Sequence, residues 1–224
     1  MKILVWGAAA QSRIILDTLS ENENLDYIIF DHIAENIVSE FRDNVITTTN
    51  ELKKAISECD HFLVGIGGSF GFARYKISNI LISFGLKPLN VFHKTSQIEK
   101  GVTFGYGTQC LPKSLICLSV KLGDCVIINS NASIDHDCKI GNGVHVMGSA
   151  AIAGNVTVGD FSTIGTNATI LPNIEIGRNV FVGAGAVVNK NIDDNKVVAG
   201  VPFAILREQE LFADIGPLRE LIES

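Results

Sequence analysis

The stretch VIINSNASIDHDCKIGNGVHVMGSAAIAGNVTVGDFSTI, residues 126–164, decides the fold. Every sixth residue from Ile128 to Ile164 is Ile or Val, and the six-residue series extends without interruption from Ile98 to Val188. All sixteen positions of this series are apolar, and a second series two residues earlier is mostly small or β-branched. A period of six does not match the 3.6 residues of a helical turn. Fixed repeats of this kind predict a solenoid.

A column of glycines adds a second period to the same region. Gly105, Gly123, Gly141, Gly159 and Gly177 are spaced by eighteen residues, which is three hexads. One turn of the solenoid should therefore hold three short strands and three corners. We expect these glycines at one corner, in a backbone conformation that a Cβ atom would hinder.

Residues 1–92 follow a different pattern, in which strand and helix signals alternate. Strands are expected at 2–6, 27–30, 45–48, 61–66 and 89–92, and helices at 11–19, 51–57 and 72–84. Asn50 is the expected N-cap of the second helix. This alternation predicts a small parallel α/β sheet with helices on both faces.

Composition excludes several classes of protein. The 224 residues are 46% hydrophobic and carry a net charge of −6, which argues against disorder and against a nucleic-acid partner. No run approaches the ~20 apolar residues of a membrane span, so membrane insertion is not expected. The five cysteines form no CxxC pair and suit free thiols, and no signal peptide is recognisable, so a cytoplasmic protein is expected.

The hexad rows resemble those of the hexapeptide-repeat acyltransferases, whose fold is a left-handed parallel β-helix. The whole chain is similar to one subfamily, which joins a small Rossmann-like nucleotide-sugar-binding domain to such a helix. The resemblance implies domains at 1–92 and 93–202, followed by a C-terminal helical tail at 203–224. It implies acetyl-CoA as co-substrate, a nucleotide-linked amino sugar as acceptor and a role in bacterial surface glycans such as O-antigen. It also implies a homotrimer. Only 12 of the 95 residues from 98 to 192 are charged, which suits flat faces of the β-helix that pack against one another in a trimer.

The resemblance also assigns the catalytic residues. His136, in Asp135-His136-Asp137-Cys138, would be the general base that takes the proton of the attacking amine. A histidine suits this task because its ordinary pKa of ~6.5 lies near working pH. Asp137 would raise the basicity of His136, at a position where the family commonly has Glu. No acyl-enzyme is expected, because the thioester is already activated.

Positions along the coils resemble those that contact acetyl-CoA. The expected cofactor residues are His145, Thr166 and Ala184, in a groove between neighbouring subunits. Residues 199–202, Ala-Gly-Val-Pro, resemble the family's motif at the end of the β-helix. Residues 203–224 then predict a short amphipathic helical cap on the exposed end of the solenoid.

The expected acceptor site lies in the first domain. The segment Gly7-Ala8-Ala9-Ala10-Gln11-Ser12 follows a strand and opens a helix, which suits a nucleotide diphosphate. The family usually has a second Gly and a His where Ala10 and Gln11 stand. By resemblance, the substrate-binding residues of this domain are Ala9, Ala10, Gln11, Asp31, His32 and Gly67, with Asp31 and His32 at positions that hold the nucleobase. Asn129, in the second domain, resembles a family position near the acceptor amine.

Other interpretations stay open at this point. O-acetylation of sialic acid or another sugar hydroxyl is the first alternative, and a catalytically silent solenoid that serves as a binding module is the second. An NAD-dependent enzyme is disfavoured because the first turn lacks G-x-G-x-x-G. A metal site at His136, Cys138, His145 and Cys125 is disfavoured because no zinc-type spacing is present and Cys138 lies in the inward series.

Overall fold

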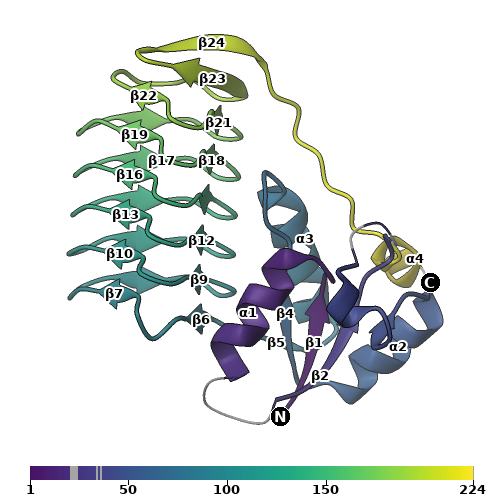
Figure 1. Cartoon of the computed structure of the whole chain (residues 1–224). Helices are drawn as coiled ribbons and strands as arrows, with labels where there is room; N and C mark the ends of the chain where they lie inside the picture. Colours follow the sequence, from purple (N-terminus) through teal and green to yellow (C-terminus); the bar gives the residue numbers. More distant parts are fainter. Residues whose placement is uncertain (21–24, 34, 36, 224) are drawn as a thin grey trace.

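The computed structural model describes residues 1–20, 25–33, 35 and 37–223, and it contains an α/β sheet beside a long column of stacked strands (Figure 1). The α/β sheet is parallel throughout and has the strand order β3-β2-β1-β4-β5. Its strands are β1 (Lys2–Trp6), β2 (Asp26–Phe30), β3 (Val45–Ile46), β4 (His61–Val64) and β5 (Lys87–Pro88). The predicted parallel α/β architecture is confirmed.

Helices cover both faces of this sheet. Successive residues of a strand point to opposite faces, and in β1 both sets of side chains are apolar. Ile3 and Val5 of β1 pack with α1 (Ala10–Ser20), whereas Leu4 and Trp6 pack with α2 (Thr49–Glu58) and α3 (Gly71–Ser83). A short 3-10 helix, Ser39–Phe41, precedes β3.

Two local predictions in this part are wrong. The cap of α2 is Thr48 and not Asn50, because Thr48 and Glu51 form a reciprocal capping box. The strand expected at 89–92 does not belong to the first sheet: β6 (Val91–Phe92) pairs with β9 of the column, and β5 closes the sheet.

The column is a parallel β-helix in three sheets, whose strands have two residues each except for the longer β23 and β24 at its end. The first sheet holds β6, β9 (Gln109–Cys110), β12 (Ile127–Ile128), β15 (His145–Val146), β18 (Thr163–Ile164), β21 (Phe181–Val182), β23 (Lys196–Gly200) and β24 (Phe203–Glu208). The second holds β7 (Gln97–Ile98), β10 (Leu115–Ile116), β13 (Ser133–Ile134), β16 (Ala151–Ile152), β19 (Thr169–Ile170) and β22 (Val187–Val188). The third holds β8 (Thr103–Phe104), β11 (Lys121–Leu122), β14 (Lys139–Ile140), β17 (Thr157–Val158) and β20 (Glu175–Ile176).

Both predicted periods are confirmed in the β-helix. Each of the sixteen series positions is the second residue of a strand from β7 to β22, and almost all of them are buried in one continuous core. Strands pair with the strand one coil away at a register of eighteen residues, as Ile134 does with Ile152. The small residues of the second series, such as Ala132 and Ala150, are fully buried between them. The fold class is the one predicted from the hexads.

The glycine column is explained by close approach of neighbouring coils. A Cβ atom on Gly105 would lie 2.5 Å from the backbone nitrogen of Asp124, and one on Gly141 would lie 2.7 Å from that of Asp160. The expectation of an unusual backbone conformation there is wrong, because neither glycine has a positive φ. The left-handed positions recur every six residues elsewhere, on residues such as Asn131 and Asp137.

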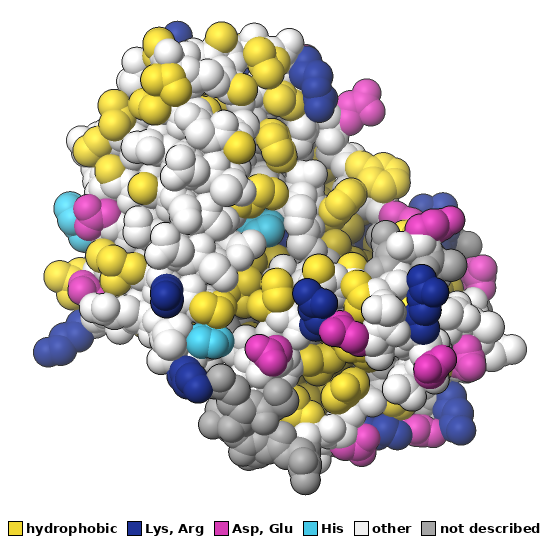
Figure 2. All heavy atoms as spheres, in the orientation of Figure 1, with side chains coloured by type: hydrophobic (Ala, Val, Ile, Leu, Met, Phe, Trp, Pro, Cys, Tyr) yellow, Lys and Arg dark blue, Asp and Glu magenta, His cyan; other side chains and the backbone are white. Residues whose placement is uncertain are grey.

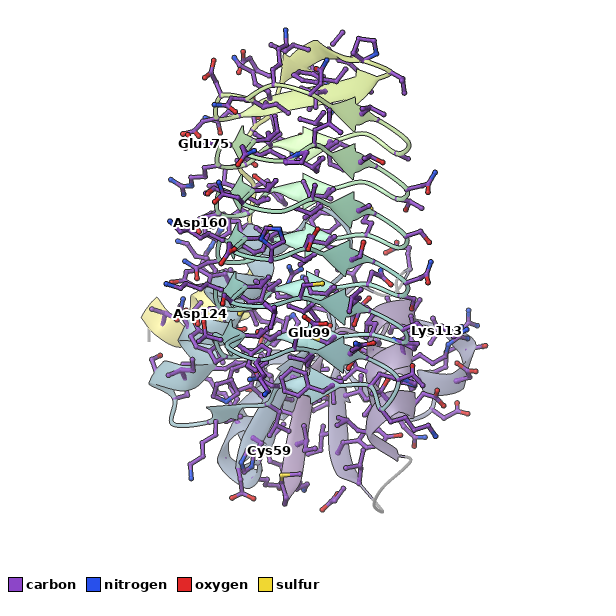
Figure 3. The ribbon with its side chains drawn as sticks, turned by 90° about the vertical axis from the view of Figure 1, so that its left-hand side faces the viewer. Cys59, Glu99, Lys113, Asp124, Asp160 and Glu175 are labelled. Carbon is purple, nitrogen blue, oxygen red and sulfur yellow. The ribbon has the colours of Figure 1, made fainter. Side chains whose placement is uncertain are left out.

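Side chains brace the edge that carries this column (Figure 3). Asp124 accepts the backbone N–H of Tyr106, and Asp160 accepts that of Asn142 one coil further on. Asn142 in turn accepts the backbone N–H of Asp124. Side-chain oxygens thus accept hydrogen bonds from the corner N–H groups that lie outside the strand pairing.

The C-terminus differs from the expected cap. Residues 203–208 form β24, which pairs antiparallel with β23 and closes the last coil. The expected helix is present as α4 (Leu218–Glu223), but it packs on the N-terminal sheet, where Leu218 is fully buried (Figure 1). The β23–β24 hairpin therefore caps the solenoid. Its strand β23 pairs with β21, and so supplies the backbone hydrogen bonds that a helix could not give to the last coil.

Candidate active site

A pocket of about 470 Å³ lies between the N-terminal sheet and the β-helix. Its first wall is formed at the carboxyl ends of the adjacent strands β1 and β4. After β1 the chain continues into a helix on one face of the sheet, and after β4 into a helix on the other face. Open α/β sheets bind ligands at this switch point. Its second wall comes from β15 and from turns of the β-helix.

The loop after β1 presents a helix N-terminus to the pocket. Gly7 ends β1 with a φ of +101°, and Ala9 and Ala10 line the pocket where α1 begins. The first turn of α1 contains no acidic residue, and its N–H groups have no partner within the helix. Such an end favours an anionic group of a ligand.

Asp31 stabilises this loop from below. It is 5% exposed, and its carboxylate accepts the N–H groups of Ala8 at 2.8 Å and Ile33 at 2.9 Å. Asp31 therefore lines the pocket as a residue that holds the loops after β1 and β2 together.

The loop after β4 needs glycine because α1 approaches it closely. A Cβ atom on Gly65 would lie 1.8 Å from the Oγ atom of Ser12, whose hydroxyl donates to the carbonyl of Gly7 at 2.6 Å. Gly67 faces the side chain of Gln11, whose Oε1 atom would lie 3.4 Å from an added Cβ. Gly65, Gly67 and Gly68 all line the pocket.

His145 is held as a neutral imidazole in the wall of the pocket. Its Nδ1–H donates to the carbonyl of Gly68 at 2.9 Å, and its Nε2 atom accepts the side-chain amide of Asn129 at 3.2 Å. The ring is 3% exposed, and burial, together with the nearby Arg74 charge, lowers the pKa of His145 to about 4. Because the Asn129 amide carries two hydrogens, one remains for a ligand.

Arg74 locks the two parts of the molecule together. This side chain of α3 is 1% exposed, and it donates to the main-chain carbonyls of Ile66 at 2.9 Å, Cys125 at 2.8 Å and Gly143 at 2.9 Å. Burial lowers the pKa of Arg74 only to about 10, so the group stays charged at neutral pH. The lock therefore fixes the loop after β4 against two coils of the β-helix.

A second polar link joins α1 to the β-helix. The buried Gln11 amide donates to the Oε1 atom of Gln109 at 2.7 Å, and the amide of Gln109 donates to the carbonyl of Val64 at 2.9 Å. Gln11 thus lines the pocket, while its side-chain amide is hydrogen-bonded to Gln109 of the β-helix.

His136 and Asp137 lie on another corner of the β-helix. His136 follows β13 of the second sheet and is half a coil away from His145, which begins β15 of the first sheet. The Nδ1 atom of His136 lies 2.8 Å from the carboxylate of Asp137, and this hydrogen bond raises the pKa of the exposed imidazole. The ring packs on Gly154 of the next coil, where a Cβ atom would lie 2.6 Å from its Nε2 atom.

The expected cofactor residues Thr166 and Ala184 form part of one column. They are exposed and lie at an eighteen-residue spacing, in line with Gly148. Successive coils of this column are joined by main-chain bonds, such as the one from Gly185 N–H to the carbonyl of Thr166 at 2.8 Å. Thr166 and Gly148 line the pocket, and Ala184 lies one coil beyond it.

The structure brings most of the predicted residues together. One pocket gathers Ala9, Ala10, Gln11, Asp31, Gly67, Asn129, His145 and Thr166. His32 lines an adjoining pocket, and His136, Asp137 and Ala184 lie outside both. Gly68, Phe70 and Gly148 also line the pocket and were not predicted from the sequence. The eighteen-residue register could have indicated Gly148, because it stands one coil before Thr166.

The described part of the chain contains neither a candidate metal site nor a candidate membrane span. No group of three or more His, Cys, Asp or Glu side chains there is arranged to hold a metal ion. Within the same residues, no helix is long and apolar enough to cross a membrane.

Comparisons with known proteins agree with the repeat. The family model described as bacterial transferase hexapeptide (six repeats) matches residues 155–190. The comparison with curated proteins gave no match.

Solved structures match nearly the whole chain. The acetyltransferase domain of PglB from Neisseria gonorrhoeae, in complex with acetyl coenzyme A, is 28% identical, with 92% of this chain and 98% of that chain covered and a TM-score of 0.82. WeeI from Acinetobacter baumannii is 25% identical, with 92% and 100% covered and a TM-score of 0.78. PerB from Caulobacter crescentus, in complex with CoA and GDP-perosamine, is 24% identical with 92% and 98% covered and a TM-score of 0.80, and it bears on the fold alone. The chain therefore carries bacterial transferase hexapeptide repeats on the fold of the PglB acetyltransferase domain, which confirms its resemblance to the hexapeptide-repeat acyltransferases.

Proposed function

We propose that this protein is an acetyl-CoA-dependent N-acetyltransferase that acts on a nucleotide-linked amino sugar of the 4-amino-deoxy type. The observation that carries the proposal is the single pocket at the switch point. It joins an anion-favouring helix end, near Ala9 and Ala10, to the polar pair Asn129 and His145. A nucleotide diphosphate at the helix end would place its sugar toward that pair.

The acetyl donor fits the column that contains Gly148, Thr166 and Ala184. These residues are small, and two of them line the pocket, so a pantetheine arm could reach the sugar along the column. The PglB domain, which is 28% identical to this chain, binds acetyl coenzyme A. The same co-substrate is proposed here.

The general base would be His136 of a second copy of the chain. Among the described residues, the one histidine that lines the pocket of a single chain is His145, and a ring whose pKa is about 4 is a poor base. His136 has the required chemistry, because Asp137 raises its pKa and leaves its Nε2 atom free for a substrate proton. In a homotrimer whose β-helices pack side by side, the corner of one copy would meet the pocket of the next.

The reaction is a direct transfer. The amine nitrogen attacks the thioester carbonyl, and a C–N bond forms as the C–S bond breaks. His136 takes the proton from the nitrogen and can pass it to the departing CoA sulfur, so no covalent enzyme intermediate is needed. Asp137 accepts the hydrogen bond from Nδ1–H and stabilises the imidazolium that forms.

The decisive experiment incubates the protein with acetyl-CoA and a panel of UDP-, dTDP- and GDP-linked 4-amino sugars and follows release of free thiol. His136→Ala is expected to lower turnover ~10²–10⁴-fold. His93→Ala is the matched control, because the ring of His93 bonds to Thr95 on the first coil, away from the pocket. Near wild-type turnover in His136→Ala would overturn the assignment of the base.

Subunit complementation tests the shared site. His136→Ala and Asn129→Ala chains are each expected to be weak alone. Trimers formed from a mixture of the two should regain part of the activity, because some sites then receive intact residues from both copies. Mixed trimers that stay as weak as their parents would place the whole site within one chain.

The alternatives lead to different outcomes in the same assay. Thiol release with sialic acid, and with none of the amines, would favour O-acetylation. Hydroxylamine would then cleave the ester product, whereas an amide would resist it. No release of thiol with any acceptor would favour a binding module. The trimer, the cytoplasmic location, the surface-glycan role and the domain limits at 92 and 202 stay predictions.

A further inference from the structure

The C-terminal strap, residues 209–217, crosses from the last coil of the β-helix to the N-terminal sheet (Figure 1). It is anchored at both ends. Gln209 donates its N–H to the carbonyl of Asn195 at 2.9 Å, and its own carbonyl accepts the Asn179 amide at 3.1 Å. At the other end, Leu218 of α4 is fully buried against the sheet. The strap is therefore held in place as a fixed wall.

This wall closes a second cavity next to the candidate active site. The cavity measures about 190 Å³, and its lining includes Phe212 and Asp214 of the strap, together with Trp6, His32, Ile66 and Phe70. It shares Gly7, Asp31, Ile66 and Phe70 with the 470 Å³ pocket, so the two cavities adjoin. A volume below the ~300–1,000 Å³ of whole ligand sites suits one part of a longer ligand.

The lining of this cavity is rich in aromatic rings. His32 stacks on Phe30 with the ring centroids 6.2 Å apart, and it meets the edge of Trp6 at 6.5 Å. Phe70 and Phe212 line the cavity and are 50% and 67% exposed overall, so each has apolar surface that a bound ring can cover. Such rings form stacking platforms for a nucleobase.

The strap also fixes the ring of His32. Asp214 lies 3.5 Å from its Nε2 atom and accepts the N–H of Gly216 at 2.8 Å. The backbone of Gly216, with a φ of +52°, packs so closely on the imidazole that a Cβ atom would lie 2.5 Å from it. Asp214 and Gly216 are thus positioning residues for His32.

We propose that the strap completes a nucleobase subsite, in which Phe212 supplies one stacking face and the Asp214–His32 pair forms the rear. This inference rests on the proposed nucleotide-linked substrate. The ligand would run from the base at the strap, through the diphosphate at the N-terminus of α1, to the sugar near Asn129 and His145. The subsite is built from both ends of the chain, because Trp6 and Phe212 line the same cavity.

Trp6 provides a direct test, because it is the single tryptophan of the chain and lines the cavity. Its fluorescence is followed during titration with UDP, dTDP, GDP and inorganic pyrophosphate. Phe212→Ala is expected to weaken the preferred nucleoside diphosphate ~5- to 150-fold, since stacking on an aromatic side chain contributes ~1–3 kcal/mol. Binding of pyrophosphate, which has no base, should not change.

Phe84→Ala is the matched control, because Phe84 is also an exposed phenylalanine and lies at the far end of α3. Acetyl-CoA binding should be equal in all three proteins. Equal nucleotide binding by wild type and Phe212→Ala would overturn the subsite while leaving the proposed function intact. An equal loss for nucleotide and pyrophosphate would also overturn it, since the strap would then act on the diphosphate loop. A wild type that binds acetyl-CoA but no nucleotide would overturn the nucleotide-linked substrate as well.

Discussion

The buried His145 makes the stability of this protein depend on pH in a defined window. Its pKa is about 4 in the folded chain, against ~6.5 for an ordinary histidine. Below pH 6.5 the unfolded chain therefore binds a proton that the folded chain excludes, so stability falls as the pH drops toward 4. Linkage between these two pKa values gives a loss of about 2 kcal/mol at pH 5, and only about 0.2 kcal/mol at pH 7.

His145→Gln removes this titration and keeps a neutral polar group in the wall of the pocket. We expect the variant to be less stable than wild type at pH 7, because the hydrogen bonds to Gly68 and Asn129 change. Its further loss between pH 7 and pH 5 should be smaller than the wild-type loss by about 2 kcal/mol. Urea unfolding at both pH values, at one fixed protein concentration, measures the difference.

The test compares how much the free energy of unfolding falls between pH 7 and pH 5 in wild type and in His145→Gln. Other groups that titrate in this range contribute equally to both proteins. Equal losses in wild type and His145→Gln would refute the argument. His145 would then be protonated in the folded chain, and its Nε2 atom could not accept the Asn129 amide.

Three further changes test the rest of the site. Asp137→Asn should shift the rising limb of the pH–rate profile to lower pH, because the hydrogen bond that raises the pKa of His136 is weakened; an unshifted limb would remove Asp137 from this role. Gly154→Ala should lower kcat with little change in acetyl-CoA affinity, because the added Cβ displaces the His136 ring; an unchanged kcat would contradict the contact. Arg74→Met should lower the free energy of unfolding in urea by roughly 3 kcal/mol or more, since it leaves three buried carbonyls without their donor; a loss under ~1 kcal/mol would show that water replaces the guanidinium.

The β-helix could be predicted almost residue by residue, because its repeat is local. Two-residue strands at a fixed spacing leave one register in which every Ile and Val of the series points inward, as Ile134 and Ile152 do. The ends of the column were harder to predict. Val91–Phe92 joins the first coil and residues 203–208 close the last one, and both pairings depend on which edge is open in three dimensions.

The contents of the site were partly predictable, but their grouping was not. Gly67, Asn129 and Thr166 come from segments far apart in the sequence, and no periodicity states how the N-terminal sheet sits against the coils. That arrangement depends on Arg74 and Gln109, which look like ordinary surface residues in the sequence and become visible only through their partners. The opposite holds for His136, whose assignment came from a motif and whose place outside the pocket needed the structure.

The charge on the surface gives a physical reason why the proposed trimer and the proposed site would depend on each other. Charged side chains gather over the N-terminal sheet, whereas the visible face of the β-helix carries few (Figure 2). A weakly charged face loses little hydration when it packs against a neighbouring copy of the chain. Such packing is also what would deliver His136 to a pocket that holds only the neutral His145. Two lysine substitutions on that face should therefore abolish both thiol release from acetyl-CoA and the association of chains measured by light scattering. They should leave the 190 Å³ cavity at the strap of each separate chain intact.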